Sequence, residues 1–297
     1  MMDIIHFNNV GDYNHLNNQE TLHPLVSLID LSKANPRKGY KMHFNLYCII
    51  LKETKCGDIK YGNNHYDYQE GTLVFFAPGQ VIEVNSQEYY QPTGLALVFH
   101  PDLLHNTALG KHMEEYSFFS YSMSEALHMS EKERKLILDC FSKLEYELNQ
   151  AIDKHSRKLI ASNIELLLNY CTRFYDRQFI TRENSNKGIL EKFEYLLNGF
   201  FNSDKPQQIG FPTVAYCAEQ LHLSANYFGD LIKKETGISA QEFIQTKLIE
   251  VAKSKVFEFD KSISQVAYEL GFKYPQHFNR LFKQKVGMTP IEFKRMN

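Results

Sequence analysis

The C-terminal end of the 297-residue chain contains the stretch ISQVAYELGFKYPQHFNRLFKQKVG, residues 263–287. An earlier stretch, VAYCAEQLHLSANYFGDLIKKETG at residues 214–237, has the same skeleton. In each copy an apolar residue is followed by Ala, Leu and a second apolar residue, then by a polar turn and a helix that ends at Gly. This spacing predicts two helix-turn-helix units, at about 213–237 and 263–287.

Each skeleton residue has an expected physical role. Ala218 and Ala267 are small because two helices are expected to cross closely there. Gly237 and Gly287 suit the left-handed position after a helix, and Pro290 suits the first turn of a following helix. The other expected inward-facing residues are Leu221, Leu223, Phe228 and Leu231 in the first copy, and Leu270, Phe272, Phe278 and Leu281 in the second.

These two segments resemble the signature of AraC/XylS-type transcription regulators. The resemblance rests on Ile263–Phe272, Phe278–Lys283 and Gly287–Arg295 in the second copy, with similar residues in the first copy, and it covers residues 188–297. It implies a C-terminal all-α domain of seven helices, in which a central helix, here about 240–257, joins two recognition helices. In that family the two helices enter adjacent major grooves on one DNA face, so we expect a site of about 17–20 base pairs.

The charge distribution also favours nucleic acid as the partner. The chain has 33 Lys and Arg and 35 Asp and Glu, for a net charge of −2. Residues 1–187 carry −4, whereas residues 188–297 carry +2, and residues 270–297 hold six cations against Glu292 alone. A local cationic surface on an acidic protein is typical of nucleic-acid binding, and the alternative is a solvated helix face.

The start of the second recognition helix carries polar residues opposite its apolar anchors. If Phe278 and Leu281 face inward, Gln276, Asn279, Arg280 and Lys283 turn outward. Arg suits guanine, Gln and Asn suit adenine, and Lys suits phosphate. We predict base contacts for the first three, where the family resemblance also places its base-reading positions, and a phosphate contact for Lys283. Further candidates for phosphate contact, or else for capping and packing, are Tyr274 and His277.

The first recognition helix departs from the cationic pattern familiar from the family. Ser224 is a natural N-cap at a helix end that favours phosphate. We predict a base contact for Asn226 and phosphate contacts for Lys233 and Lys234. Asp230 would repel phosphate, so it either accepts from a cytosine amino group or pairs with a neighbouring Lys. The residues expected to face outward here are Asn226, Tyr227, Gly229 and Asp230.

The first 100 residues or so predict strands, and hence a sandwich or small barrel in an N-terminal domain of residues 1–180. Tyr66–Gln80 resembles the second half of a cupin-type sensor barrel, so we expect a cupin-like β-barrel with a helical extension. The expected strands are MHFNLYCIILKE at 42–53, CGDIKYG at 56–62, TLVFFAP at 72–78, QVIEVNS at 80–86 and GLALVFH at 94–100.

The cupin-like segment lacks the histidine set that a metal-binding cupin would supply. The turn at 61–67 holds His65 alone, and no His follows Gln80 at the matching place. We therefore predict no metal, no cofactor and no enzyme activity. The alternatives are a cupin-type enzyme fused to a DNA-tethering module, or a scaffold that occupies DNA without sensing. The histidines expected at the surface or satisfied in the interior are His43, His65, His100 and His105.

Two helices, at about 130–152 and 154–179, are predicted after the strands. Their apolar stripes could pair with a second subunit as a short coiled coil, or pack against their own barrel. The polar segment 181–188 is predicted to be a linker, followed by a helix at 189–201 and a turn-rich break at 202–212. The stripes consist of Ile137, Phe141, Leu144 and Leu148, and of Ile160, Ile164, Leu167, Cys171 and Phe174.

The chain as a whole reads as a cytoplasmic DNA-binding transcription regulator. It has no apolar run of about 18–20 residues and no secretory signal at its start, and its five scattered cysteines suggest a reducing compartment. Double-stranded DNA is the expected partner. A small-molecule effector, a second copy of the chain and RNA polymerase are further candidates, and no residue is assigned to an effector.

Overall fold

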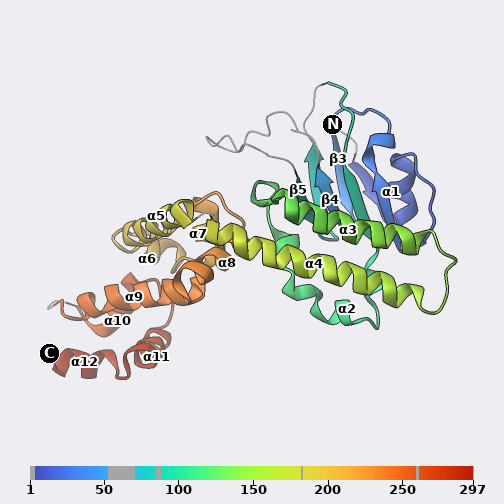
Figure 1. Cartoon of the computed structure of the whole chain (residues 1–297). Coiled ribbons are helices and arrows are strands. Elements are labelled where there is room, and N and C mark those ends of the chain that lie inside the picture. Colours follow the sequence, from blue (N-terminus) through green and yellow to red (C-terminus); the bar gives the residue numbers. More distant parts are fainter. Residues whose placement is uncertain (1–3, 53–70, 85–87, 182, 259–260, 297) are drawn as a thin grey trace. The chain divides into compact units, whose positions relative to one another are not determined.

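The computed structural model describes residues 4–52, 71–84, 88–181, 183–258 and 261–296 (Figure 1). The chain divides into two compact units, Met1–Thr181 and Arg182–Asn297. The boundary between the units falls within the segment 181–188, where we predicted a linker. The described residues of that segment are helical, because α4 ends at Thr181 and α5 begins at Glu183, so the linker is not a loop. Its polar composition suits the exposed side of a helix as well as it suits a loop.

Unit 1 contains strands in two sheets and two long helices. Strands occur where we expected them near 72–78, 80–86 and 94–100, and the strand expected at 56–62 lies outside the described residues. The single strand expected at 42–53 is instead two strands, which belong to different sheets. The strands are β1 Ile4–Phe7, β2 Val26–Asp30, β3 Tyr40–Phe44, β4 Tyr47–Lys52, β5 Thr72–Phe76, β6 Gln80–Val84, β7 Leu95–Phe99 and β8 Leu127–His128. The α-helices are α1 Val10–Leu16, α2 Ala108–His112, α3 Glu131–Leu148 and α4 Ser156–Thr181. Short 3-10 helices are η1 Leu31–Lys33, η2 Pro101–Leu104, η3 Met113–Glu115, η4 Ser117–Ser120 and η5 Met123–Glu125.

The described strands form two open sheets. The smaller has the order β1-β3-β6, with β1 parallel to β3, and the larger has the antiparallel order β2-β7-β4-β5-β8. No pairing among the described residues joins the edges of these sheets into a ring, so this part of the chain does not confirm the cupin-like barrel that we predicted.

The core of unit 1 lies between the two sheets. Alternate side chains of each strand point into this space, and the rings of Phe44 on β3 and Phe76 on β5 lie 6.0 Å apart and nearly parallel. Met42 and Val98 are also buried in the same cluster. The opposite face of the larger sheet, including Phe75, is buried as well. Helices α3 and α4 lie against this side of the unit (Figure 1).

The apolar stripes of α3 and α4 are buried within unit 1. All nine residues of the two stripes are at most 7% exposed, and the two helices pack on each other and on β2 and β8. Of the two interpretations of these stripes, packing within the protomer is therefore right. A coiled-coil seam with a second subunit through these side chains is wrong, because they are already covered.

All the regular secondary structure among the described residues of unit 2 is helical. The central helix expected at 240–257 is α9, and the break expected at 202–212 contains the short helix α6. The helix expected at 189–201 begins earlier, because α5 includes the polar residues from Glu183 onward. The helices are α5 Glu183–Phe201, α6 Lys205–Ile209, α7 Val214–Gln220, α8 Ala225–Thr236, α9 Ala240–Val256, α10 Ile263–Glu269, α11 Pro275–Val286 and α12 Pro290–Met296.

The two copies of the repeat share the same turn after their first helix. In the first copy the N–H of Leu223 donates to the carbonyl of Ala218 at 2.9 Å, and in the second Phe272 donates to Ala267 at 3.0 Å. This six-to-one bond is typical of a turn whose central residue is left-handed. That residue is His222 in the first copy, with φ 57°, and Gly271 in the second, with φ 89°. The predicted left-handed glycines are confirmed, with φ 77° at Gly237 and 88° at Gly287.

Because the backbone of His222 is left-handed, a histidine at this position is expected to make unit 2 less stable than a glycine would. A side chain in this region of backbone space is disfavoured by about 1–2 kcal/mol, partly offset by the extra freedom that glycine gives the unfolded chain. We expect His222→Gly to stabilise unit 2 by up to about 1 kcal/mol, as measured by calorimetric melting. A loss of stability would mean that the imidazole makes contacts worth more than the backbone strain.

Candidate nucleic-acid interface

The second helix of each repeat is anchored from within by large apolar side chains. Phe228 and Leu231 on α8 are fully buried, as predicted, and so is Phe278 on α11. The prediction for Leu281 needs correction, because this residue is only half-buried and the neighbouring Phe282 is fully buried instead. The true anchors of α11 are therefore spaced by four residues, which fixes the rotation of the helix about its axis.

This rotation exposes one polar face of α11. Gln276, Arg280 and Lys283 are exposed, on the side opposite the buried phenylalanines. The outward orientation deduced for these three side chains is thus confirmed, while their contacts with bases and phosphate stay predictions. The guanidinium, amide and ammonium groups together form a donor-rich strip along two turns of the helix.

Asn279 differs from this group. Its side chain is half-buried, and its Oδ1 atom is buried with no hydrogen-bond partner among the described residues. It lies on the flank of α11, about 100° around the helix from the buried Phe278, so the fully outward position that we predicted is wrong. The base contact of Asn279 stays a prediction, and it requires the side chain to turn its amide toward the exposed face of the helix.

Tyr274 and His277 lie at the N-terminal end of α11. Tyr274 occupies the N-cap position but its side chain makes no capping hydrogen bond, so capping is not its role. Its ring is 55% exposed and contacts the exposed His277 edge-on, with centroids 5.6 Å apart. Both side chains therefore stand at the helix end that suits an anion, and their phosphate contacts stay a prediction.

The first recognition helix, α8, presents a different surface. Ser224 is the N-cap, and its hydroxyl accepts from the N–H of Tyr227 at 3.3 Å. Tyr227 itself is only 5% exposed, so its expected outward orientation is wrong. Asn226, Lys233 and Lys234 are exposed. The two lysines lie in the last turn of α8, where a cation is also stabilised by the helix dipole.

Two of the six cations counted at the C-terminal end hold the domain together. The Lys285 ammonium on α11 lies 3.1 Å from a carboxylate oxygen of Glu242 on α9, and Lys294 donates to the backbone carbonyl of Glu258 at 3.2 Å. The charge count from the sequence therefore overstates the number of cations available to DNA, because pairing is invisible in composition.

A small ionic cluster ties the end of α9 to α10. Lys261 lies 2.7 Å from both Glu258 and Glu269, and Lys255 lies 3.3 Å from Glu269. Burial alone would raise the pKa of Glu269, but hydrogen bonds from Lys261 and Lys255 outweigh it and lower that pKa. Partly exposed pairs of this kind contribute at most about 1 kcal/mol each, so their main effect is to orient α10.

Backbone contact joins α6 to the turn of the second repeat. A Cβ atom at Gly271 would lie 2.7 Å from the carbonyl oxygen of Pro206 and 2.8 Å from the carbonyl carbon of Gly210. The rings of Phe211 and Phe272 pack beside this contact, 5.4 Å apart. Only a glycine lets the two backbones approach this closely, so the position of the second repeat relative to α6 depends on residue 271.

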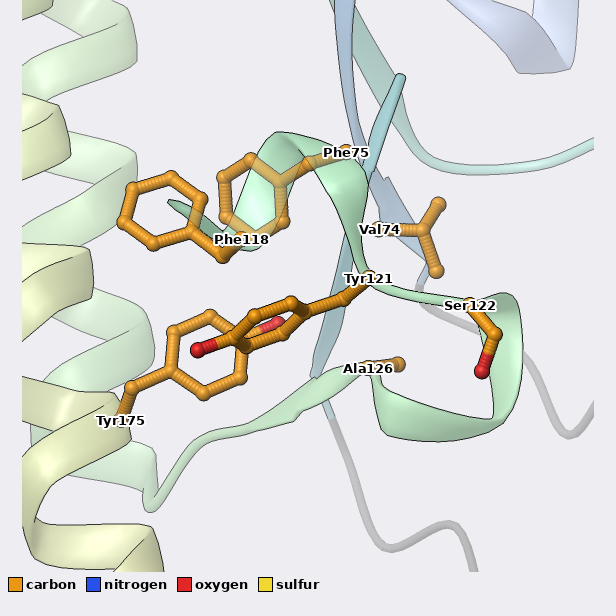
Figure 2. Close-up of a pocket in the computed structure, with 7 residues that line it drawn as sticks. All are labelled: Val74, Phe75, Phe118, Tyr121, Ser122, Ala126 and Tyr175. Atoms are coloured by element: carbon orange, nitrogen blue, oxygen red, sulfur yellow. The ribbon is translucent and has the colours of Figure 1, made fainter. Parts of the chain in front are cut away.

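The described part of unit 1 contains a small cavity. One cavity lies between β5, η4, η5 and α4, where the rings of Phe118 and Tyr175 stack 5.4 Å apart (Figure 2). Its volume is about 10 Å³, room for about one water molecule. The predicted cupin turn with His65 lies outside the described residues. Among the described helices none is long and apolar enough to cross a membrane.

A family model described as a helix-turn-helix domain matches residues 217–296, from within α7 to the end of α12. Residues 217–296 are a helix-turn-helix domain. This range contains both recognition helices and the central helix α9, so the duplicated skeleton and the family match coincide.

Several relatives of the chain are transcription regulators by name. An uncharacterized HTH-type transcriptional regulator, YtdP of Bacillus subtilis, is 35% identical over 109 residues, which are 37% of this chain and 13% of the relative. The transcriptional regulatory protein YesN of Bacillus subtilis, also uncharacterized, is 34% identical over 79 residues, 26% of this chain and 22% of that protein. The chain thus spans less than a quarter of the length of these two curated relatives.

The solved structures include a transcriptional regulator with an AraC-type DNA-binding domain from Chromobacterium violaceum. It is 19% identical to this chain, with a TM-score of 0.33, and the match covers 38% of this chain and 94% of that one.

Proposed function

We propose that the chain is an AraC-type transcription regulator that binds double-stranded DNA through two recognition helices in adjacent major grooves. The observation that carries the proposal is the helix-turn-helix domain with its duplicated turn, in which α11 exposes Gln276, Arg280 and Lys283. Exposed donors on the second helix of such a unit suit the acceptor-rich edges of the major groove.

The two recognition helices contribute differently in this proposal. Helix α11 reads bases, because Arg280 can donate two hydrogen bonds to guanine and Gln276 can pair with adenine. Helix α8 supplies mainly phosphate contacts from Lys233 and Lys234, with Asn226 as its base contact. Its Asp230 stands at the place that corresponds to Arg280, so the two half-sites are expected to differ in sequence.

Unit 1 is the proposed regulatory part. A second copy of the chain, RNA polymerase or a small molecule could act on it and shift the affinity of unit 2 for DNA. The cavity of about 10 Å³ cannot hold an effector of ordinary size. A small-molecule effector would therefore need another site, and the buried stripes of α3 and α4 would not supply the interface with a second copy.

Salt dependence tests the proposed DNA contacts of α11. We expect Lys283→Ala to weaken binding to all duplexes and to reduce the slope of log K against log salt by about 0.9, the loss of one phosphate contact. Fluorescence anisotropy with a labelled duplex between low and moderate salt measures this slope.

Lys285→Ala is the matched control for that measurement. This residue is two positions away on the same helix, but its ammonium is occupied by Glu242. We expect its slope to equal that of the wild type once folding has been checked by circular dichroism. A wild-type protein without salt-dependent DNA binding would overturn the proposed function, and an unchanged slope in Lys283→Ala would remove this contact from it.

A further inference from the structure

The outer face of the smaller sheet brings two histidines together that lie far apart in the sequence. His6 on β1 and His43 on β3 are direct partners in the parallel register. Their Nδ1 atoms lie 3.3 Å apart and their ring centroids 5.2 Å apart, with the rings inclined by 65°. His6 is exposed and His43 half-buried, so the pair is open to solvent.

We propose that His6 and His43 form a surface site for a divalent transition-metal ion such as Zn²⁺, bound through their two Nδ1 atoms. Neutral imidazole is a ligand that zinc, nickel and copper share. No cluster of three or more His, Cys, Asp or Glu suited to a metal occurs among the described residues. The remaining coordination positions are therefore open to water or to a donor from another molecule.

Both distances fit ligands of one tetrahedral ion. Two nitrogens, each about 2.05 Å from a zinc ion at the tetrahedral angle, lie about 3.3 Å apart. The centroids of their rings, somewhat farther from the same ion, lie about 5.2 Å apart. The observed separations are 3.3 and 5.2 Å, so both agree with two ligands of one ion.

A hydrogen bond between the two rings explains these distances less well. A hydrogen bond from N–H to oxygen spans about 2.7–3.2 Å along a nearly straight line. The Nδ1 separation of 3.3 Å still allows a hydrogen bond between the two nitrogens, at its long end. The distance between the ring centroids, 5.2 Å, is however shorter than a straight hydrogen bond of 3.3 Å between the two imidazoles would give. The difference is about a few tenths of an ångström.

The surroundings hold the pair in place. The strand pairing fixes His6 opposite His43, and the other neighbour of His43 across the sheet is Val81 on β6. Ile4 and Val81 are large apolar residues that are 45% and 58% exposed on this sheet. A metal ion bound here would link β1, an edge strand, to the central strand β3, and so stabilise the sheet.

Zinc titration of the full-length, tag-free protein tests the site. After treatment with a chelator, zinc is added while the melting temperature of the protein and its heat of binding are followed. We expect zinc to raise the melting temperature of the wild type through binding to the folded state. His6→Ala and His43→Ala should each lower the zinc affinity at least tenfold, because one of two protein ligands is lost.

Two further variants separate metal binding from other effects. His15→Ala removes an exposed histidine elsewhere in unit 1 and should keep the full response to zinc. His6→Gln keeps hydrogen-bonding groups but is a poor zinc ligand, so it should fold and yet lose the response. The proposal would be overturned by an absent response in the wild type, or by a response in His6→Gln or His43→Ala as large as that of the wild type.

Discussion

Arg280→Ala is expected to lower the affinity of the chain for its preferred DNA sequence by roughly 5- to 150-fold, which is the value of a good two-bond contact with guanine, about 1–3 kcal/mol. The reason lies in the rotation of α11, where the buried Phe278 and Phe282 turn Arg280 to the exposed side. Gln276→Ala, one turn earlier on the same face, is expected to cost a similar amount at an adjacent base pair.

The preferred sequence can be selected from a random duplex library with the wild-type protein. Affinities for the selected duplex and for an unrelated duplex of equal length then give a specificity ratio, which is more informative than either affinity alone. Arg280→Ala should reduce this ratio, since it removes a contact to a base edge and leaves the phosphate contacts.

Lys283→Ala is the matched variant for this ratio. It lies on the same exposed face, and its loss should weaken both duplexes equally and leave the ratio unchanged. Base readout by α11 would be refuted by an unchanged ratio in the variant that carries both Arg280→Ala and Gln276→Ala.

The skeleton of unit 2 could be predicted from the sequence because its turns demand particular residues. Local sterics require a left-handed residue after each second helix and a small residue where the two helices of each unit cross. The structure has these residues at the positions that the spacing predicts, with Gly237 and Gly287 left-handed and Ala218 and Ala267 buried. The errors concern rotation about the helix axis. One assumed anchor, Leu281, is half-buried, and the rotation it implied put Asn279 too far outward.

Contacts with neighbouring helices determine which side chains of a helix are buried or paired, and the spacing of residues within one helix does not show these contacts. Tyr227 is buried although its counterpart in the second copy, His277, is exposed. In the same way, the pairing of Lys285 with Glu242 joins residues 43 positions apart. A count of charged residues in the sequence does not show that Lys285 is already paired with a carboxylate.

Unit 1 was less predictable because its architecture depends on long-range strand pairing. The strands near β4, β5 and β7 were expected from their apolar runs, whereas β1 and β2 were missed. Short strands joined in a parallel pair such as β1 and β3 leave no hairpin signal in the sequence. The juxtaposition of His6 and His43 follows from that pairing alone, so a search for closely spaced metal ligands could not find it.

Gly271→Ala is expected to destabilise unit 2 by about 2–5 kcal/mol. The left-handed backbone at residue 271 costs about 1–2 kcal/mol with any side chain. The added methyl group also meets three backbone atoms of α6 and the residues directly after it, at 2.7, 2.8 and 2.9 Å, and overpacking of this kind costs about 1–3 kcal/mol. For a unit of this size the melting temperature should fall by roughly 8–20 °C, which calorimetry on the full-length chain can follow.

Gly287→Ala separates the two causes. Its φ of 88° matches the 89° of Gly271, but a methyl group there would meet nothing within 4 Å. We expect the free energy of unfolding of this variant to fall only by the backbone cost of about 1–2 kcal/mol. The difference in stability between the two variants therefore measures the contact with α6. Equal losses would mean that the segment after α6 moves aside freely. In that case residue 271 would not determine where the second repeat sits, and the spacing of the two recognition helices would depend on α9 and its ion pairs instead.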